Sequence, residues 1–399
     1  PDAVHVLRVR RLPLYSFPYE WSTAQLRDAA LLTLRVLRMA LRHGMTLKDA
    51  SAFNVSFDGA RPVFTDLLSF TAWREGEPWA GYRQFCEHFL LPLLLSRRAG
   101  VSLGTLLRGM HEGVPLPVGS RLLRGCASLR PSQFMHVHLH ARAIRRSART
   151  TQDARTTGRR QSLTQTLALV DSLRRAVEGV RVAEAGSVWA EYYSDTVYSA
   201  AETERKEALV RRWIERVQPA SVWDLGSNTG RYARIASDAG IPTMAFDADD
   251  AVVERMYAEA SAREDAFLTP LVMNLANPSP ALGWAHGERE SLAARGPADL
   301  VLYLGLMHHL RFPNMVPLHL QMEYLHRLAR HAIVEWIPRE DVNVQRMIRG
   351  TVRERFDYDL EGFVEAVAAY FEIVEKDVLG ESGREVYLLR SKNKRQPQN

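Results

Sequence analysis

The residues best suited to chemistry lie in one short stretch, Asp224-Leu-Gly-Ser-Asn-Thr-Gly230. An apolar run at 220–223 precedes it, and a segment with helical character, 231–239, follows it. Gly226 and Gly230 can adopt backbone angles that a side chain forbids, and they let a ligand approach the main chain closely. The stretch therefore predicts a ligand-binding turn between a strand and a helix.

A second acid follows the turn. An apolar run at 241–246 ends in Asp247, a position that suits contact with ribose hydroxyls in a βαβ unit. The turn departs from the dinucleotide pattern G-x-G-x-x-G, because Asn228 stands at the middle glycine and Asp224 leads the turn. A carboxylate there would repel a pyrophosphate and attract a cationic group. The pattern favours a ribose-containing ligand with an amino group.

Strand-like and helix-like segments alternate through the second half of the chain. Strands are expected at 220–223, 241–246, 267–273, 298–304 and 332–336, an antiparallel pair at 371–375 and 385–389, and helices at 250–262, 317–328 and 360–370. Alternation of this kind predicts a parallel sheet covered on both faces, with ligands at the carboxyl ends of its strands.

The form D-L-G-x-x-x-G followed by an acid resembles motif I of the class I S-adenosylmethionine (SAM) methyltransferases. The resemblance covers about 187–390 and implies an α/β fold: a Rossmann-like seven-stranded methyltransferase sheet, here preceded by an N-terminal mixed α+β domain. It implies SAM as the cofactor and no metal. By this resemblance Asp224, Gly226 and Gly230 would hold the methionine part of SAM, Asp247 would bind the ribose, and Asn274 and Leu275 would lie beside the adenine. The other implied cofactor-binding residues are Ser227, Asn228, Leu304, Tyr193 and Tyr198.

Two features of this implied site carry alternatives. Many relatives have an acid where this chain has Asn274, so a contact with the adenine amino group would use the amide oxygen. Tyr193 and Tyr198 belong to an aromatic segment before the first strand, which in this fold often caps the cofactor pocket. Their rings would contact the sulfonium by cation–π attraction. Packing onto the sheet is the alternative.

Methyl transfer to a hydroxyl or amine requires alignment of the reactants and removal of a proton. His308 and His309 follow the fourth expected strand, and histidine accepts protons near neutral pH. Either is a candidate base, while packing or cofactor contact is the alternative role. Glu335, at the end of the fifth strand, is the other candidate. Lys206, on the helix before the first strand, is interpreted as a solvated helix lysine.

Composition limits the partners. The net charge of +6 and the pI near 9.4 are typical of proteins that bind nucleic acids. The arginine-rich stretch at 142–160, however, contains no aromatic residue for base stacking. This favours a small-molecule acceptor, with tRNA or protein as the second acceptor class and a SAM-binding regulator without turnover as the third interpretation. No apolar stretch reaches the ~18 residues of a membrane span. With two cysteines and no signal-like start, a cytoplasmic location is expected; oligomeric state stays open.

The first half suggests a separate unit. We expect an accessory domain at 1–140, a basic linker and helix at 141–185, the methyltransferase domain at 186–391 and a polar tail at 392–399. Helices are expected at 23–43 and 81–95. Asp49, Asn54 and Asp66 resemble the catalytic Asp, metal-binding Asn and metal-binding Asp of the protein-kinase and aminoglycoside-phosphotransferase family, whereas no glycine-rich loop or strand lysine precedes them. A retained scaffold fragment, active phosphoryl transfer and a chance hairpin remain as interpretations.

The whole chain also resembles a bacterial family of class I methyltransferases with nodulation-protein-like members. The segments that carry this resemblance are Phe17-Pro-Tyr-Glu-Trp-Ser22, Leu47-Lys-Asp-Ala-Ser51, Tyr82-Arg-Gln-Phe-Cys-Glu-His88 and Ser187-Val-Trp-Ala-Glu-Tyr-Tyr193. The resemblance implies the pairing of domains and names no substrate.

Overall fold

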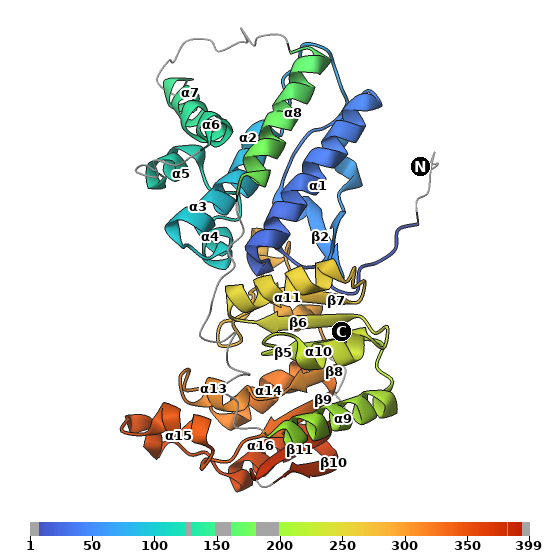
Figure 1. Ribbon diagram of the computed structural model, residues 1–399, viewed down its shortest axis with the longest axis vertical. Helices are drawn as coiled ribbons and strands as arrows, with labels where there is room; N and C mark the ends of the chain where they lie inside the picture. The colour runs from blue at the N-terminus through green and yellow to red at the C-terminus, as the bar shows by residue number, and fades with distance from the viewer. Residues whose placement is uncertain (1–7, 124–129, 148–160, 181–198, 381, 393–399) are drawn as a thin grey trace.

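The computed structural model describes residues 8–123, 130–147, 161–180, 199–380 and 382–392 (Figure 1). An N-terminal unit of helices and two short hairpin-like sheets is followed by a large sheet with helices on its faces. No helix in these ranges is both long enough and apolar enough to cross a bilayer.

The large sheet has seven strands in the order β10-β11-β9-β8-β5-β6-β7. Its strands are β5 (Val222–Leu225), β6 (Thr243–Asp247), β7 (Leu268–Val272), β8 (Ala298–Tyr303), β9 (Ala329–Trp336), β10 (Phe371–Leu379) and β11 (Arg384–Ser391). The five from β5 to β9 pair in parallel, and β11 pairs antiparallel with both β9 and β10. The predicted α/β class, with a Rossmann-like seven-stranded methyltransferase sheet, is confirmed.

Alternate residues along each strand pack onto opposite layers of helices, as the two-residue period of a strand requires. On β8, Leu300 and Leu302 join the cluster formed by α9 (Ala200–Val217) and α10 (Arg231–Ser237). Val301 and Tyr303 join the cluster that includes α14 (Leu318–Leu328) and α16 (Leu360–Tyr370). Burial on both faces explains why these strands read as continuous apolar runs.

Helix starts follow capping signals in the sequence. Asp249 accepts hydrogen bonds from the first turn of α11 (Asp250–Ala262), and Ser199 forms a capping box with Glu202 at α9. Ser22 forms the same kind of box with Gln25 at α1 (Thr23–Arg42). Each cap satisfies backbone N–H groups that the helix itself leaves without partners.

The N-terminal unit contains the predicted hairpin and helices. The strands β2 (Val55–Asp58) and β3 (Arg61–Phe64) form the hairpin, and β1 (Met45–Leu47) pairs with β4 (Phe70–Ala72). The helices after α1 are α2 (Tyr82–Phe85), α3 (Leu91–Ala99), α4 (Leu103–Gly109), α5 (Leu116–Leu122), α6 (Pro131–Phe134), α7 (His140–Ser147) and α8 (Leu163–Glu178). The helix expected within 141–185 is α8, and it packs along α1 within this unit.

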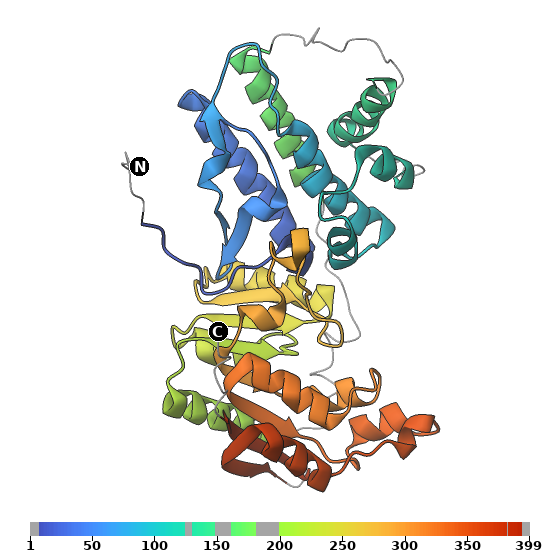
Figure 2. The same ribbon diagram turned by 180° about the vertical axis from the view of Figure 1, so that it is seen from behind.

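The N-terminal unit is seated on β7, the edge strand of the sheet (Figures 1 and 2). Gln25 Nε2 donates to the Pro270 carbonyl at 3.0 Å, and the Thr269 hydroxyl donates to the Gly59 carbonyl at 3.2 Å. Gly59 has φ +59°, and a Cβ there would lie 2.5 Å from the backbone of Ala266, so this close approach needs glycine. An edge strand that would otherwise expose unpaired backbone groups is thereby covered.

Candidate cofactor site and active site

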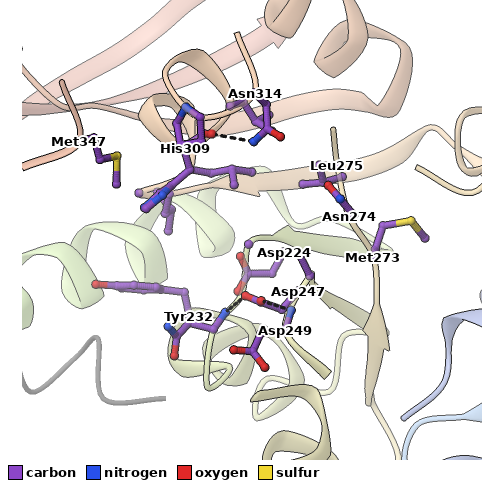
Figure 3. Close-up of a pocket in the computed structure, with 18 of the residues that line it drawn as sticks. Asp224, Tyr232, Asp247, Asp249, Met273, Asn274, Leu275, His309, Asn314 and Met347 are labelled. Atoms are coloured by element: carbon purple, nitrogen blue, oxygen red, sulfur yellow. Dashed lines mark hydrogen bonds between the residues drawn. The ribbon is translucent and has the colours of Figure 1, made fainter. Parts of the chain in front are cut away.

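A cavity of about 490 Å³ opens at the carboxyl ends of the parallel strands (Figure 3). This is the edge at which open α/β sheets bind their ligands. The residues lining it come from several strand ends, connections and helices: Lys206, Asp224, Gly226, Asn228, Tyr232, Asp247, Ala248, Asp249, Met273, Asn274, Leu275, Leu304, Gly305, Leu306, His309, Leu310, Pro313, Asn314, Met347 and Arg384. The predicted turn, second acid and adenine-side pair thus meet in one cavity.

The glycine turn is fixed by the end of β6. Gly226 and Ser227 donate their backbone N–H groups to the Phe246 carbonyl at 2.8 and 2.9 Å. Gly226 has φ +75°, and a Cβ on it would lie 3.1 Å from the Leu306 side chain at the cavity wall. Gly230 has φ +81° and is the N-cap residue of α10. Glycine at these positions therefore gives the turn its shape and leaves its backbone open to a ligand.

Asp247 connects the two turns that form the cavity floor. Its carboxylate accepts hydrogen bonds from Asn228 N at 2.8 Å and from Asp249 N at 3.0 Å. Burial raises the pKa of this carboxyl, and those two backbone donors oppose the rise. The side chain that would contact a ribose also holds the shape of the site.

Asp224 places a buried carboxylate oxygen at the cavity wall. It is 2 % exposed, lines the cavity, and its Oδ2 atom has no hydrogen-bond partner among the described residues. Burial raises the pKa of this carboxyl to about 7, and the charge of Lys206 opposes the rise. A buried, unpaired acceptor at a cavity wall fits a cationic donor such as the amino group of SAM.

Four buried charged groups form a network that includes Lys206, whose charge acts on the Asp224 carboxyl. Lys206 Nζ is 2.7 Å from Glu335 Oε2, and Arg384 donates to Asp341 Oδ2 at 2.7 and 3.0 Å. Arg384 Nη1 also lies 3.6 Å from Glu335 Oε1. The interpretation of Lys206 as a solvated lysine is wrong: it is 2 % exposed, and its ammonium lies 4.6 Å from the centre of the Tyr232 ring.

The structure separates the three candidate bases. His309 lines the cavity, and burial lowers its pKa to about 4, so its imidazole is neutral near pH 7. His308 is fully buried, does not line the cavity, and neither of its ring nitrogens has a partner among the described residues. Glu335 is fully buried between Lys206 and Arg384 and does not itself line the cavity. Of these groups, only His309 faces the cavity.

Some of the remaining predicted site residues line the cavity and others do not. Asn274, Leu275 and Leu304 line the cavity, whereas Ser227 and Gly230 support the turn from behind it. Asn274 Oδ1, the atom predicted to meet an adenine amino group, accepts a hydrogen bond from Ala276 N at 2.9 Å. Tyr193 and Tyr198 lie outside the described residues.

Several lining residues were missed in the sequence. Tyr232 is the second residue of α10, and Figure 3 shows its side chain to the left of Asp224, with His309 above. Arg384 begins β11, the strand that returns antiparallel beside β9. Met347 comes from α15 (Val342–Ile348), a short helix for which no period was recognised. The only signal for Tyr232 was its position in the helix after the glycine turn, and the only signal for Arg384 was its position at the start of the last strand.

The kinase-like trio in the N-terminal unit comes together around one hydroxyl. Ser69 Oγ lies 2.7 Å from Asp49 Oδ1 and 2.8 Å from Asp66 Oδ2, and Asn54 Nδ2 donates to Ser69 Oγ at 3.0 Å. Within the described ranges, no cluster of three or more His, Cys, Asp or Glu side chains is arranged to hold a metal. The three residues are therefore neighbours, and a kinase-like origin stays a prediction.

Part of the chain is similar to solved structures of other proteins. No family model matches the chain. Among solved structures, magnesium protoporphyrin IX methyltransferase (ChlM) from Synechocystis PCC 6803 with bound SAH is similar over 51 % of this chain and 93 % of its own, with 17 % identity and a TM-score of 0.37. The bifunctional kinase-methyltransferase WbdD is similar over 50 % of this chain and 41 % of its own, with 15 % identity and a TM-score of 0.36.

One curated relative matches nearly end to end. Nodulation protein NoeA of Rhizobium meliloti (strain 1021) is 34 % identical over 392 residues, which cover 96 % of this chain and 82 % of that protein. The alignment spans the N-terminal unit and the sheet together. The chain belongs to the family of nodulation protein NoeA.

Proposed function

We propose that this protein is a SAM-dependent methyltransferase that acts on an oxygen or nitrogen of a small-molecule acceptor. The observation that carries the proposal is the unpaired Oδ2 of buried Asp224, beside a glycine turn whose backbone is open to a ligand. A carboxylate so placed needs a cationic partner. Dinucleotide binding would instead place a pyrophosphate against this acid.

The lining residues divide into roles along the cavity. Asp224 would accept from the amino group of the methionine part, and Asp247 would accept from the ribose hydroxyls. Met273, Asn274 and Leu275 lie together at one end, where the adenine would lie between side chains and backbone (Figure 3). When bound, SAM supplies a methyl group on an already activated sulfonium leaving group.

His309 is the residue that would accept the acceptor's proton. It faces the cavity, and its lowered pKa keeps the ring nitrogens free of an extra proton at neutral pH. Leu306, Leu310 and Met347 give the same region apolar walls that exclude water. A largely apolar cavity of this size suits a small acceptor better than a folded nucleic acid.

The test is calorimetric titration of the protein with SAM and, separately, with Mg·ATP. Micromolar SAM binding without an ATP signal is expected. ATP binding without SAM binding would overturn the proposal and direct attention to Asp49, Asn54 and Asp66. Binding of SAM without methyl transfer to any fraction of a cellular metabolite pool would instead favour a SAM-binding regulator.

A further inference from the structure

The N-terminal unit reaches both turns that would hold the adenosine half of the cofactor. Arg108, on α4, contacts the segment that follows β7. Burial raises the pKa of Asp250 at the start of α11, and the Ser102 side chain, just before α4, opposes that rise. The segment after β7 carries Met273, Asn274 and Leu275, and the segment before α11 carries Ala248 and Asp249. All five residues line the cavity.

Arg108 holds the outer side of a compact turn. Its Nη1 donates to the Asn277 carbonyl at 3.0 Å, and its Nη2 donates to Ser279 Oγ at 3.3 Å. Asn277 N in turn donates to the Asn274 carbonyl at 3.0 Å. The guanidinium therefore fixes the backbone whose inner side carries Asn274 and Leu275.

A second route leads from the same guanidinium to Met273. Ser279 is 2 % exposed, and its backbone N–H and hydroxyl lie 3.3 and 3.6 Å from the Met273 sulfur. Arg108 is itself placed by the N-terminal unit, since its guanidinium carbon lies 5.8 Å from the centre of the Tyr19 ring. Two hydrogen bonds to one planar group impose an orientation that a single point charge does not.

From these contacts we infer that Arg108 is a positioning residue for the adenosine half of the cofactor site, acting through the turn from Met273 to Ser279. The inference rests on the proposed function for its ligand. It gives the N-terminal unit a defined part in cofactor binding that the motif in the sheet does not show. Arg108 touches the turn and not the cavity, so its effect passes through Met273, Asn274 and Leu275.

The experiment compares wild type with Arg108→Ala, Arg108→Lys and Arg97→Ala, the last a control at an exposed arginine on the neighbouring helix α3. Amide hydrogen exchange of the segment 273–279 is measured without ligand. Binding of adenosine and of SAM is measured by calorimetry, and thermal midpoints are recorded. Asp224→Asn serves as a contrast, because adenosine has no methionine amino group.

Arg108→Ala is expected to speed exchange in 273–279 and to weaken adenosine and SAM by the same factor, about five- to tenfold. Arg108→Lys should recover part of the loss, and Arg97→Ala should change nothing. Asp224→Asn should weaken SAM while sparing adenosine. Unchanged exchange in Arg108→Ala, or loss of SAM affinity with adenosine affinity intact, would overturn the inference.

The outcome separates this inference from the proposed function. If wild type binds neither SAM nor adenosine, the proposed function and the cofactor role of Arg108 both fail, whereas faster exchange would still show that Arg108 orders the turn. If wild type binds both ligands and Arg108→Ala binds them equally well, only the role of Arg108 fails.

Discussion

Lys206 Nζ and Glu335 Oε2 lie 2.7 Å apart, and neither side chain is more than 3 % exposed. The pair connects α9, which precedes the first strand of the sheet, to the end of β9. Burial lowers the pKa of Lys206, and the Glu335 carboxylate opposes that shift. The carboxylate that favours the charged form of this desolvated lysine thus comes from a residue 129 positions away in the sequence.

Removing one member of this pair leaves the other buried without its main counter-charge. Lys206→Met and Glu335→Gln should each lower the free energy of unfolding by roughly 3 kcal/mol, measured by urea denaturation. Arg212→Ala is the matched control, because its ion pair with Glu375 lies on the surface and should contribute less than about 1 kcal/mol. Equal effects in all three variants would show that the buried pair contributes nothing special.

The sequence predicted those parts of the fold that local signals specify. α11 and α16 match their expected ranges, since Asp249 and Asp359 cap them and each helix keeps a regular apolar period. The succession of parallel strands along the chain was predicted from buried apolar runs separated by helices, whereas their order in the sheet was not predicted. The glycine turn and Asp247 were predicted because the residues that define this pattern lie at short, regular spacing in the sequence.

The rest depends on contacts between distant segments. Lys206 is buried because β9 and β11 bring Glu335 and Arg384 to it, and no local pattern around residue 206 contains that information. Met347 was missed because α15 is too short to establish a period. The bracing of 273–279 by Arg108 joins two units that the sequence presents as separate.

SAM affinity should depend on pH through Asp224. The pKa of its carboxyl is about 7 in the free protein, against 3.8 for an unperturbed group, and a bound amino group favours the ionised form. Affinity should therefore fall as pH drops below 7, by at most about tenfold per pH unit, with proton release on binding. Calorimetry from pH 5.5 to 8.5 measures both; a flat profile would contradict the role of Asp224.

The raised pKa of Asp224 also affects stability: as pH rises, the protein should lose stability while its affinity for SAM increases. Because the folded-state pKa is raised, ionising Asp224 costs stability as pH rises from about 4 to about 7. Asp224→Asn should therefore be more stable than wild type at pH 8 and should bind SAM more weakly, without pH dependence. Chemical denaturation at pH 5 and pH 8 compares the two proteins; a destabilised Asn variant at pH 8 would argue against a desolvated carboxylate.

His309 should be needed for turnover more than for cofactor binding. His309→Gln should lower kcat by about 10²- to 10⁴-fold, the usual contribution of a general base, while the SAM dissociation constant changes only a few-fold. His319→Ala, at an exposed position on α14, is the control. Since the pKa of His309 is about 4, its protonation should not limit the rate between pH 6 and pH 9. Full activity in His309→Gln would exclude it as the base.

The two units should unfold together, because Glu20 and Arg295 join them through a buried ion pair. Arg295 Nη1 donates to Glu20 Oε2 and to the Tyr15 carbonyl, both at 2.9 Å, and both charged side chains are at most 3 % exposed. Scanning calorimetry of wild type should show one transition, since a single apolar core extends across this boundary.

Arg295→Met leaves Glu20 buried without its partner, so the transition should move to lower temperature and lose roughly 3 kcal/mol of stability. Arg61→Ala is the control, because it removes an exposed ion pair across the same boundary: Arg61 and Glu264 lie 3.6 Å apart, and both side chains are exposed. It should leave the transition unchanged. Two separate transitions in wild type, with neither shifted in Arg295→Met, would show that the units are energetically independent.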